Sequence, residues 1–269
     1  MYQWILASVI VFFASVLQAA TGFGFAIMAT PFLLLVFNSR ECVQISIILS
    51  FVVSLLLIRK IMKDVDRVLL RRLIIGSVVG VPLGVLFYKY INLDILKVTV
   101  SIVILILTFI LMLRSYKTDS KPKFENKSDN SLVSQDTSAV NSTFILKITQ
   151  LFVGFGAGLF TTSIGMPGVP LILYYNSTNT QKNTARSTTL AFFIFIYIIS
   201  FVTQLSIVKT NLDIVASSLI LIPVVALGVF VGNILFGKIN QITFQRIAYG
   251  ILLLTGFYMS ITSFSSIHI

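Results

Sequence analysis

The chain has 269 residues, of which 57% are hydrophobic and only 11% are charged, and its mean hydropathy is +0.98. This composition, with apolar runs near the ~20 residues that cross a bilayer, excludes an ordinary soluble domain and predicts an all-α integral membrane protein. The net charge of +11 does not indicate nucleic-acid binding, because the basic residues lie in short loops beside apolar runs, where lysine and arginine set membrane orientation.

The first half of the chain, residues 1–113, contains five apolar segments. Its start has the apolar core of a signal peptide but no basic residue before it, so a first membrane helix with Tyr2 and Trp4 at the interface fits better. A charged loop, Arg59–Arg72, follows the third segment. The expected segments are Trp4–Ala20, Phe25–Phe37, Cys42–Ile58, Leu73–Tyr88 and Leu93–Leu113.

A polar stretch, residues 114–142, follows the first half. It is rich in Ser, Asn, Asp and Lys and cannot bury enough apolar surface to fold alone, so we interpret it as a linker to a second membrane half, residues 143–269. The segments expected in that half are Phe144–Thr162, Gly168–Tyr175, Ser187–Val208, Ile214–Phe236 and Ile247–Phe264.

The two halves share short patterns, which predict a duplicated architecture of the kind common in secondary transporters. Each half has a proline, a short apolar run and an asparagine, PFLLLVFN from Pro31 and PLILYYN from Pro170. A glycine pair that precedes Ile-Asn begins at Gly80 and again at Gly228. We therefore expect two repeated halves, each with an interrupted helix.

The interruptions are ATGFGFAIMATP, residues 20–31, and TTSIGMPGVP, residues 161–170. Glycine and proline break a helix and free backbone N–H groups that lipid cannot satisfy. In the first interruption, Thr30-Pro31 is typical of an N-cap followed by proline at the first helical position, and in the second, Gly168-Val169-Pro170 can start a helix. Two such helix starts near mid-membrane would favour an anion.

Two topologies are compatible with the interruptions. If each interrupted pair crosses once, the chain has eight spans; if each dips in and returns, it has six spans plus two re-entrant hairpins, and the halves have opposite orientation. The positive-inside bias favours the second, with the Arg59–Arg72 loop and the linker cytoplasmic. The basic residues then left outside are Arg40, Lys89, Lys97 and Lys209.

The predicted substrate site combines residues of both interruptions with one arginine. Gly, Ser and Thr in membrane helices serve packing more often than ligand contact, so the pairing of the interruptions supports the functional interpretation. We expect Arg186 near the second interruption, either adding a positive charge for an anion or setting orientation at the interface. The candidate substrate-binding residues are Thr21, Gly22, Gly24, Thr30, Pro31, Thr162, Ser163, Gly165, Gly168, Pro170 and Arg186.

Other small and polar residues have a different expected role. Gln44, Gln204 and Asn233 lie within apolar segments and need partners, through helix contacts or a polar path. Glycines spaced by four predict close helix packing. These glycines are Gly76, Gly80, Gly84, Gly154, Gly158, Gly228 and Gly232.

No motif supports an enzyme. The acids lie in loops or at segment ends, the single histidine is His268, and there is no HExxH, GxxxxGKS or Ser/His/Asp set. The single cysteine, Cys42, excludes an internal disulfide and cannot alone form a metal site. We therefore expect no enzymatic activity, no metal and no cofactor; proton coupling would need a group such as Glu41 or the ionisation of the substrate itself.

Three stretches carry a family resemblance: QAATGFGFAIMATPFLL (Gln18–Leu34), GLFTTSIGMPGVPLILYY (Gly158–Tyr175) and ARSTTLAFF (Ala185–Phe193). The first two are similar to the two glycine-rich signatures of the TauE/SafE family of sulfite exporters, in GFGFA and GMPGPP-like variants, and the third resembles the segment that follows. Both depart from the commoner GxGGG form, and Val169 replaces a proline often found there.

The resemblance implies a multi-pass plasma-membrane transporter that moves a small anion by alternating access. Sulfite and organosulfonates such as sulfoacetate are typical family cargo. The expected partners are the anion and the lipid bilayer, with a possible homo-oligomer and no nucleic acid. A passive anion channel and a non-transporting membrane scaffold are the alternatives.

Overall fold

The computed structural model of the chain describes residues 2–58, 62–118, 138–178, 180–208 and 212–235, with residues 250, 253, 255–258, 260 and 261 beyond them. These residues form helices and no strand, which confirms the all-helical prediction. Within the described ranges, seven helices are long and apolar enough to cross a membrane: α1 (Tyr2–Thr21), α3 (Glu41–Ile58), α4 (Arg67–Tyr90), α5 (Leu93–Thr118), α6 (Ser138–Ile164), α8 (Lys182–Val208) and α9 (Leu212–Leu235). Two α-helices are shorter, α2 (Phe25–Phe37) and α7 (Gly168–Ser177), and a 3-10 turn, η1, spans Met62–Asp64.

Helices extend further into the polar stretches than composition predicts. α5 continues to Thr118 and α6 begins at Ser138, so both ends of the expected linker are helical. α4 takes in the end of the charged loop because Asp66 caps it, its carboxylate accepting hydrogen bonds from the backbone N–H groups of Val68 and Leu69. Residues 119–137, and most of the last predicted segment, lie outside the described residues.

The first interrupted pair, α1 and α2, is an antiparallel hairpin. Gln3 Nε2 donates a hydrogen bond of 3.2 Å to the backbone oxygen of Val36, and the rings of Trp4 and Phe37 meet edge to face with centroids 5.3 Å apart. The start of α1 therefore lies beside the end of α2. The chain enters and leaves this pair at the same end of the bundle.

That end, which we call the Arg40 end, also holds the connection between α4 and α5. Arg40 follows α2, and its Nη1 donates to the backbone oxygen of Ile91 at 2.7 Å. The Tyr88 hydroxyl donates to the backbone oxygen of Arg40 at 2.9 Å. The α2–α3 and α4–α5 connections, which are far apart in the sequence, are thus held together by hydrogen bonds.

The second interrupted pair, α6 and α7, returns at the opposite end, which we call the Arg72 end. Arg72 in the first turns of α4 donates to Gln150 Oε1 of α6 at 2.5 Å, and Gln150 Nε2 donates to the hydroxyl of Tyr174, near the end of α7, at 2.8 Å. The start of α8 belongs to the same end, since Thr188 Oγ1 accepts a hydrogen bond from the backbone N–H of Asp66 at 3.0 Å.

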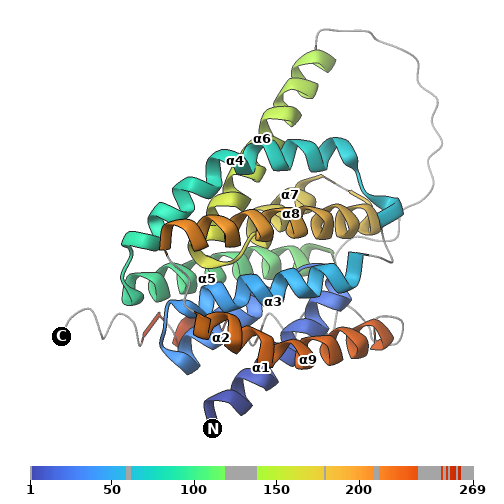
Figure 1. Cartoon of the computed structure of the whole chain (residues 1–269). Helices are drawn as coiled ribbons and strands as arrows, with labels where there is room; N and C mark the ends of the chain where they lie inside the picture. The colour runs from blue at the N-terminus through green and yellow to red at the C-terminus, as the bar shows by residue number, and fades with distance from the viewer. Residues whose placement is uncertain are drawn as a thin grey trace.

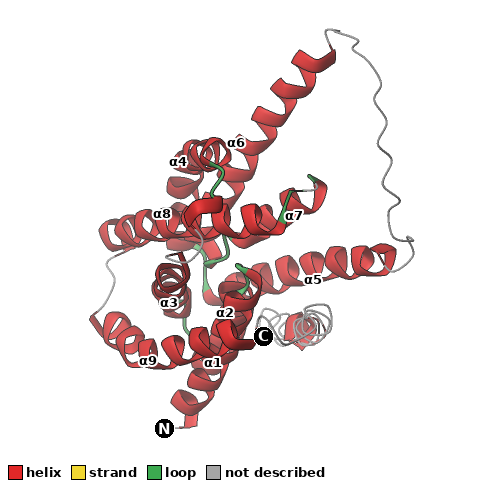
Figure 2. Ribbon diagram, turned by 90° about the vertical axis from the view of Figure 1, so that its right-hand side faces the viewer, coloured by secondary structure: helices red, strands yellow, loops and turns green. Residues whose placement is uncertain are grey.

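Two closely packed helix pairs form opposite edges of the bundle. Figures 1 and 2 both place α4 with α6 at one edge and α1 with α9 at the other, with α8 and α3 between them. A Cβ added to Gly158 of α6 would lie 2.7 Å from the backbone oxygen of Ser77 in α4, and one added to Gly228 of α9 would lie 2.7 Å from that of Phe12 in α1. The prediction of close packing is confirmed for the glycines spaced by four, which are Gly76, Gly80, Gly84, Gly154, Gly158, Gly228 and Gly232.

Candidate functional site

Each interrupted pair contains a short non-helical break. The first break is residues 22–24, between α1 and α2, and the second is residues 165–167, between α6 and α7. Gly22, Gly24 and Gly165 have φ angles of 86°, 126° and 77°. Residues with a Cβ rarely adopt these conformations, so glycine allows the chain to turn back in both places.

The start of α2 differs from the prediction. Thr30-Pro31 does not begin the helix; α2 begins at Phe25, with Gly24 as its N-cap. The reason is a side chain outside the short motif, because Gln18 Oε1 accepts a hydrogen bond of 3.2 Å from the Phe25 N–H. Pro31 lies inside α2 and removes the donor that would reach the backbone oxygen of Ile27.

The start of α7 agrees with the prediction. The helix begins at Gly168, with Pro170 in its first turn. Its N-cap, Pro167, makes no side-chain capping bond, and the same is true of Gly24 at the start of α2. The N-cap residue of neither short helix provides a side-chain cap. Both N-termini carry the positive end of the helix dipole.

The two breaks lie against each other. A Cβ added to Gly168 would lie 3.6 Å from Ile27 Cδ1 and 3.9 Å from Phe23 Cβ, and one added to Gly165 would lie 3.5 Å from Thr30 Oγ1. Residues of the two interruptions, which are far apart in the sequence, are therefore in contact range of each other. The beginnings of α2 and α7 meet inside the bundle.

The hydroxyl groups at the breaks differ in their partners. Thr162 Oγ1 donates to the backbone oxygen of Val81 at 3.0 Å, Ser163 Oγ to that of Leu159 at 2.7 Å, and Thr21 Oγ1 to that of Leu17 at 2.8 Å. Thr30 is fully buried, and its Oγ1 has no hydrogen-bond partner within the described part of the chain. Three hydroxyls thus hold the backbone, and the fourth faces the opposite break with its hydrogen-bonding capacity unused.

Arg186, predicted to lie near the second break, is in direct contact with the first. Its Nη2 donates a hydrogen bond of 2.5 Å to the backbone oxygen of Ala19, in the last turn of α1, and a Cβ added to Gly22 would overlap its side chain. A cation at a helix C-terminus satisfies carbonyl groups and stabilises the helix dipole. The arginine therefore fixes the end of α1 and adds positive charge beside the break.

Two glutamines brace the breaks. Gln204, singled out by its place in an apolar segment, donates from Nε2 to the backbone oxygen of Thr162 at 2.9 Å. Gln18 holds the Phe25 N–H and donates from Nε2 to Ser54 Oγ of α3 at 3.1 Å. The role of Gln18 is not predicted from the sequence, although a buried amide four residues before the first break could have indicated it.

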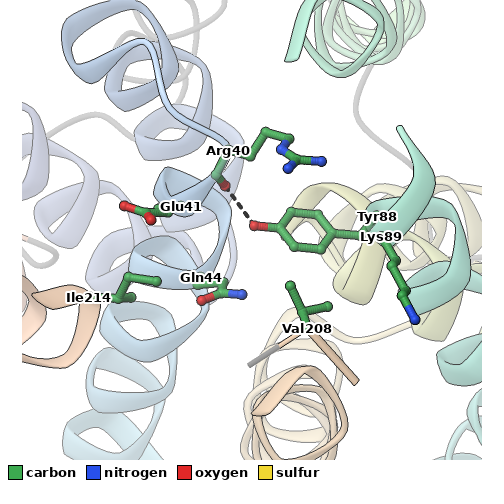
Figure 3. A pocket seen from close by; sticks show the side chains of 7 residues that line it. All are labelled: Arg40, Glu41, Gln44, Tyr88, Lys89, Val208 and Ile214. Atoms are coloured by element: carbon green, nitrogen blue, oxygen red, sulfur yellow. Dashed lines mark hydrogen bonds between the residues drawn. The ribbon is translucent and has the colours of Figure 1, made fainter. Parts of the chain in front are cut away.

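A cavity of about 210 Å³ opens at the Arg40 end (Figure 3). A water molecule occupies about 30 Å³ of liquid, so the cavity has room for several waters or a small oxyanion. Arg40 and Lys89 supply positive charge and Glu41 a carboxylate, while Gln44 reaches it from the buried face of α3. The lining residues are Arg40, Glu41, Gln44, Tyr88, Lys89, Val208 and Ile214.

The comparisons with known proteins point to one family. A model of the family described as sulfite exporter TauE/SafE matches residues 7–259, which include both breaks, six of the seven long helices and all but the start of α1. No curated protein and no solved structure matches the chain. Within the described ranges, no three His, Cys, Asp or Glu side chains gather as a metal site.

Proposed function

Since the chain belongs to the TauE/SafE family of sulfite exporters, whose members are membrane transporters and not enzymes, we propose that it carries a small anion across the membrane by alternating access. The proposed cargo is a sulfur oxyanion or an organosulfonate, such as sulfite or sulfoacetate. The chain is a multi-pass membrane protein. We assign it to the plasma membrane with the Arg40 end outside, an orientation supported by the basic residues concentrated at the Arg72 end.

One observation carries this proposal, the meeting of the two breaks. The beginnings of α2 and α7 face each other within the bundle, and the first N–H groups of a helix have no partner inside it. Backbone amides and a positive dipole end favour an anion, and the Thr30 hydroxyl can donate a further hydrogen bond. No acidic side chain lies in the described parts of α2 or α7 to oppose the anion's charge.

The residues predicted from sequence have four proposed roles. Gly22, Gly24, Gly165, Gly168, Pro31 and Pro170 shape the breaks so that backbone groups face the anion. Thr30 contacts it directly, while Thr21, Thr162 and Ser163 hold the surrounding backbone. Arg186 supplies positive charge next to the first break and keeps its hydrogen bond to the backbone oxygen of Ala19.

Contacts between helices support a duplicated protein with inverted halves. α1–α2 returns at the Arg40 end and α6–α7 at the Arg72 end. α4 packs on α6 and α8, and in the same way α9 packs on α1 and α3, as expected if α1–α4 correspond to α6–α9. The sequences ILSFVVSL (Ile48–Leu55) and IISFVTQL (Ile198–Leu205) align under this correspondence. We therefore retain residues 1–113 and 143–269 as the two membrane repeats, joined by residues 114–142.

The test is a flux screen of purified protein in liposomes against sulfite, sulfate, sulfonates and carboxylates. A carrier predicts saturable flux with counterflow for at least one sulfur anion. Flux that does not saturate and shows no counterflow would instead identify a passive channel, and no flux of any anion would favour a scaffold.

The site assignment has its own test. Arg186→Ala removes the charge beside the first break, and Gly165→Leu introduces a side chain where φ is 77° and Thr30 is close. Both variants are expected to insert in the membrane and to lose most of the flux. Gly156→Ala, whose added Cβ would make an ordinary contact of 3.4 Å with Pro170, is the matched control. Unchanged flux in both test variants would remove the assignment.

A further inference from the structure

Four helices, two of which begin at the breaks, contact one another in a closed cycle. α2 contacts α3, α3 contacts α8, α8 contacts α7, and α7 contacts α2. We call these four helices the inner ring. α4 and α6 lie on one side of it and α1 and α9 on the other (Figures 1 and 2).

The inner ring contains the buried side-chain oxygens that lack a well-formed hydrogen bond. Among the described residues, each such oxygen belongs to α2, α3, α7 or α8. Ser50 and Thr189 lie beside the hydroxyls of Tyr197 and Tyr175, which are themselves in the ring. The residues concerned are Thr30, Gln44, Ser46, Ser50, Tyr175, Ser187, Thr189, Ser200 and Gln204.

An unsatisfied buried polar group is expensive, typically about 1–3 kcal/mol, so most buried polar groups in proteins are paired. Buried hydroxyls elsewhere in the bundle follow this rule. Ser218 of α9 donates to the backbone oxygen of Ile214 at 2.8 Å, and Thr108 of α5 to that of Ile104 at 2.7 Å. Ser50, Thr189 and Tyr175 have a neighbouring hydroxyl, but Thr30, Ser46, Ser187 and Ser200 have no such neighbour within the described ranges, and their concentration in one ring indicates groups that meet a solute or water during function.

The unpaired groups extend along most of the membrane thickness. On α8 they begin at Ser187, beside Arg186, and end at Gln204, a stretch of about 26 Å at 1.5 Å per residue. The hydrocarbon core of a bilayer is about 30 Å thick. At the Arg40 end, Gln44 connects the ring to the cavity drawn in Figure 3, which Tyr88 and Val208 also line.

We propose that the inner ring is the route of the anion, entered at the Arg40 end through this cavity. Hydroxyl groups and the amide nitrogens of the glutamines can donate hydrogen bonds to an oxyanion along the ring, and positive charge stands near both ends, at Arg40 and Lys89 and at Arg186. Glu41, which also lines the cavity, lies at its rim and is exposed. The inference rests on the proposed transport of a small anion and adds the path that the anion takes.

Thiol labelling tests the route, because Cys42 is the chain's single cysteine and Cys42→Ala gives a cysteine-free background. In that background, Ser46→Cys and Ser200→Cys place a thiol in the inner ring, and Ser218→Cys and Thr108→Cys place one at equally buried positions outside it. The probe is (2-sulfonatoethyl) methanethiosulfonate, a water-soluble anion, applied to protein in liposomes without sulfite.

We expect both ring thiols to react at least about tenfold faster than both control thiols, since reaction requires access of the reagent. We also expect modification of the ring thiols, and not of the controls, to block sulfite flux in variants that carry it beforehand. Ring thiols that react no faster than the controls, in a protein that transports sulfite, would overturn the route and leave the proposed function intact. A wild-type protein that carries no anion while its ring thiols react selectively would remove the transport function and retain an anion-accessible ring.

Discussion

The outer helix pairs, α4–α6 and α1–α9, and the inner ring both use small residues, but for different purposes. In α4–α6 and α1–α9, small residues bring backbones into contact, and buried hydroxyls such as those of Ser77 and Ser15 donate to backbone oxygens. In the inner ring, equally small residues, such as Ser46 and Ser200, are buried with unused hydrogen-bonding groups. Close backbone packing at the described glycines is therefore confined to the outer pairs, and the inner ring holds the buried hydroxyls proposed to meet a solute.

The two closely packed helix pairs also limit which parts of the protein can move as units. α4 packs closely on α6, and α1 packs closely on α9. Each of these pairs therefore joins one helix from the first half of the sequence to one from the second half. Alternating access by rocking one half against the other would have to open both pairs. Movement between a group containing α1, α2, α3 and α9 and a group containing α4, α6, α7 and α8 keeps both pairs intact.

Breaking an outer pair should have the largest effect. In Gly80→Val, the new Cβ would overlap the backbone oxygen of Phe155 in α6, and neither backbone can yield cheaply. We expect a loss of at least about 3 kcal/mol of stability, seen as aggregation or a much lower unfolding temperature of the purified protein in detergent.

Gly156→Ala on the same helix pair is the control, since its Cβ would make only ordinary contacts with Pro170. If Gly80→Val unfolded at the temperature of the Gly156→Ala protein, the outer pair would not be packed as closely as described above.

Changing a break should have the next largest effect. Gly22→Ala places a Cβ where φ is 86° and where the side chain of Arg186 already lies. The left-handed conformation and the overlap together should cost about 2–3 kcal/mol and abolish most sulfite flux.

Comparing this change in the wild-type and Arg186→Ala backgrounds separates the two causes. Removal of the arginine side chain should restore part of the stability, because it relieves the overlap and leaves the backbone strain. Equal losses in the two backgrounds would show that Arg186 does not press on the first break.

Much of this contrast could be predicted from the sequence. The glycines spaced by four indicated close helix packing, though not which helices pair, and the glycine and proline clusters indicated both breaks and the start of α7 at Gly168. These features depend on local chemistry, the absence of a Cβ or of an N–H, which a single sequence displays directly.

What could not be predicted depends on contacts between distant segments. Thr30-Pro31 has the local chemistry of a helix start, yet Gln18 of the preceding helix starts α2 at Phe25. Arg186 is near the second break in sequence order but reaches the first in space. The inner ring could not be predicted either. It is recognised by serine side chains that lack hydrogen-bond partners, and the sequence does not show which serines lack them.

Removing a brace should have a smaller effect than changing a break. Gln204→Leu leaves the backbone oxygen of Thr162 without the donor that satisfies it, at the end of α6. We expect a loss of about 1–2 kcal/mol in thermal unfolding, with reduced sulfite flux.

Gln204→Glu keeps the size of this side chain, and at this fully buried position beside a carbonyl oxygen the carboxyl is neutral and can donate its O–H, so it should unfold closer to wild type than Gln204→Leu does. Wild-type unfolding temperatures in both variants would contradict the bracing role and would place Gln204 among the groups that serve only the route.

The smallest expected effect lies at the mouth of the ring. Lys89 is exposed at the cavity and has no part in holding the outer pairs, so Lys89→Gln should leave the unfolding temperature unchanged. Its charge acts on the anion through solvent, where screening is strong, and we expect only about a twofold rise in the sulfite concentration for half-maximal flux at low ionic strength, vanishing at high salt. The neutral Gln keeps much of the length of the lysine, which makes charge the variable that is tested. A salt-independent change of the same size would mean that the side chain acts through packing, and the entrance would then have to be sought elsewhere around the ring.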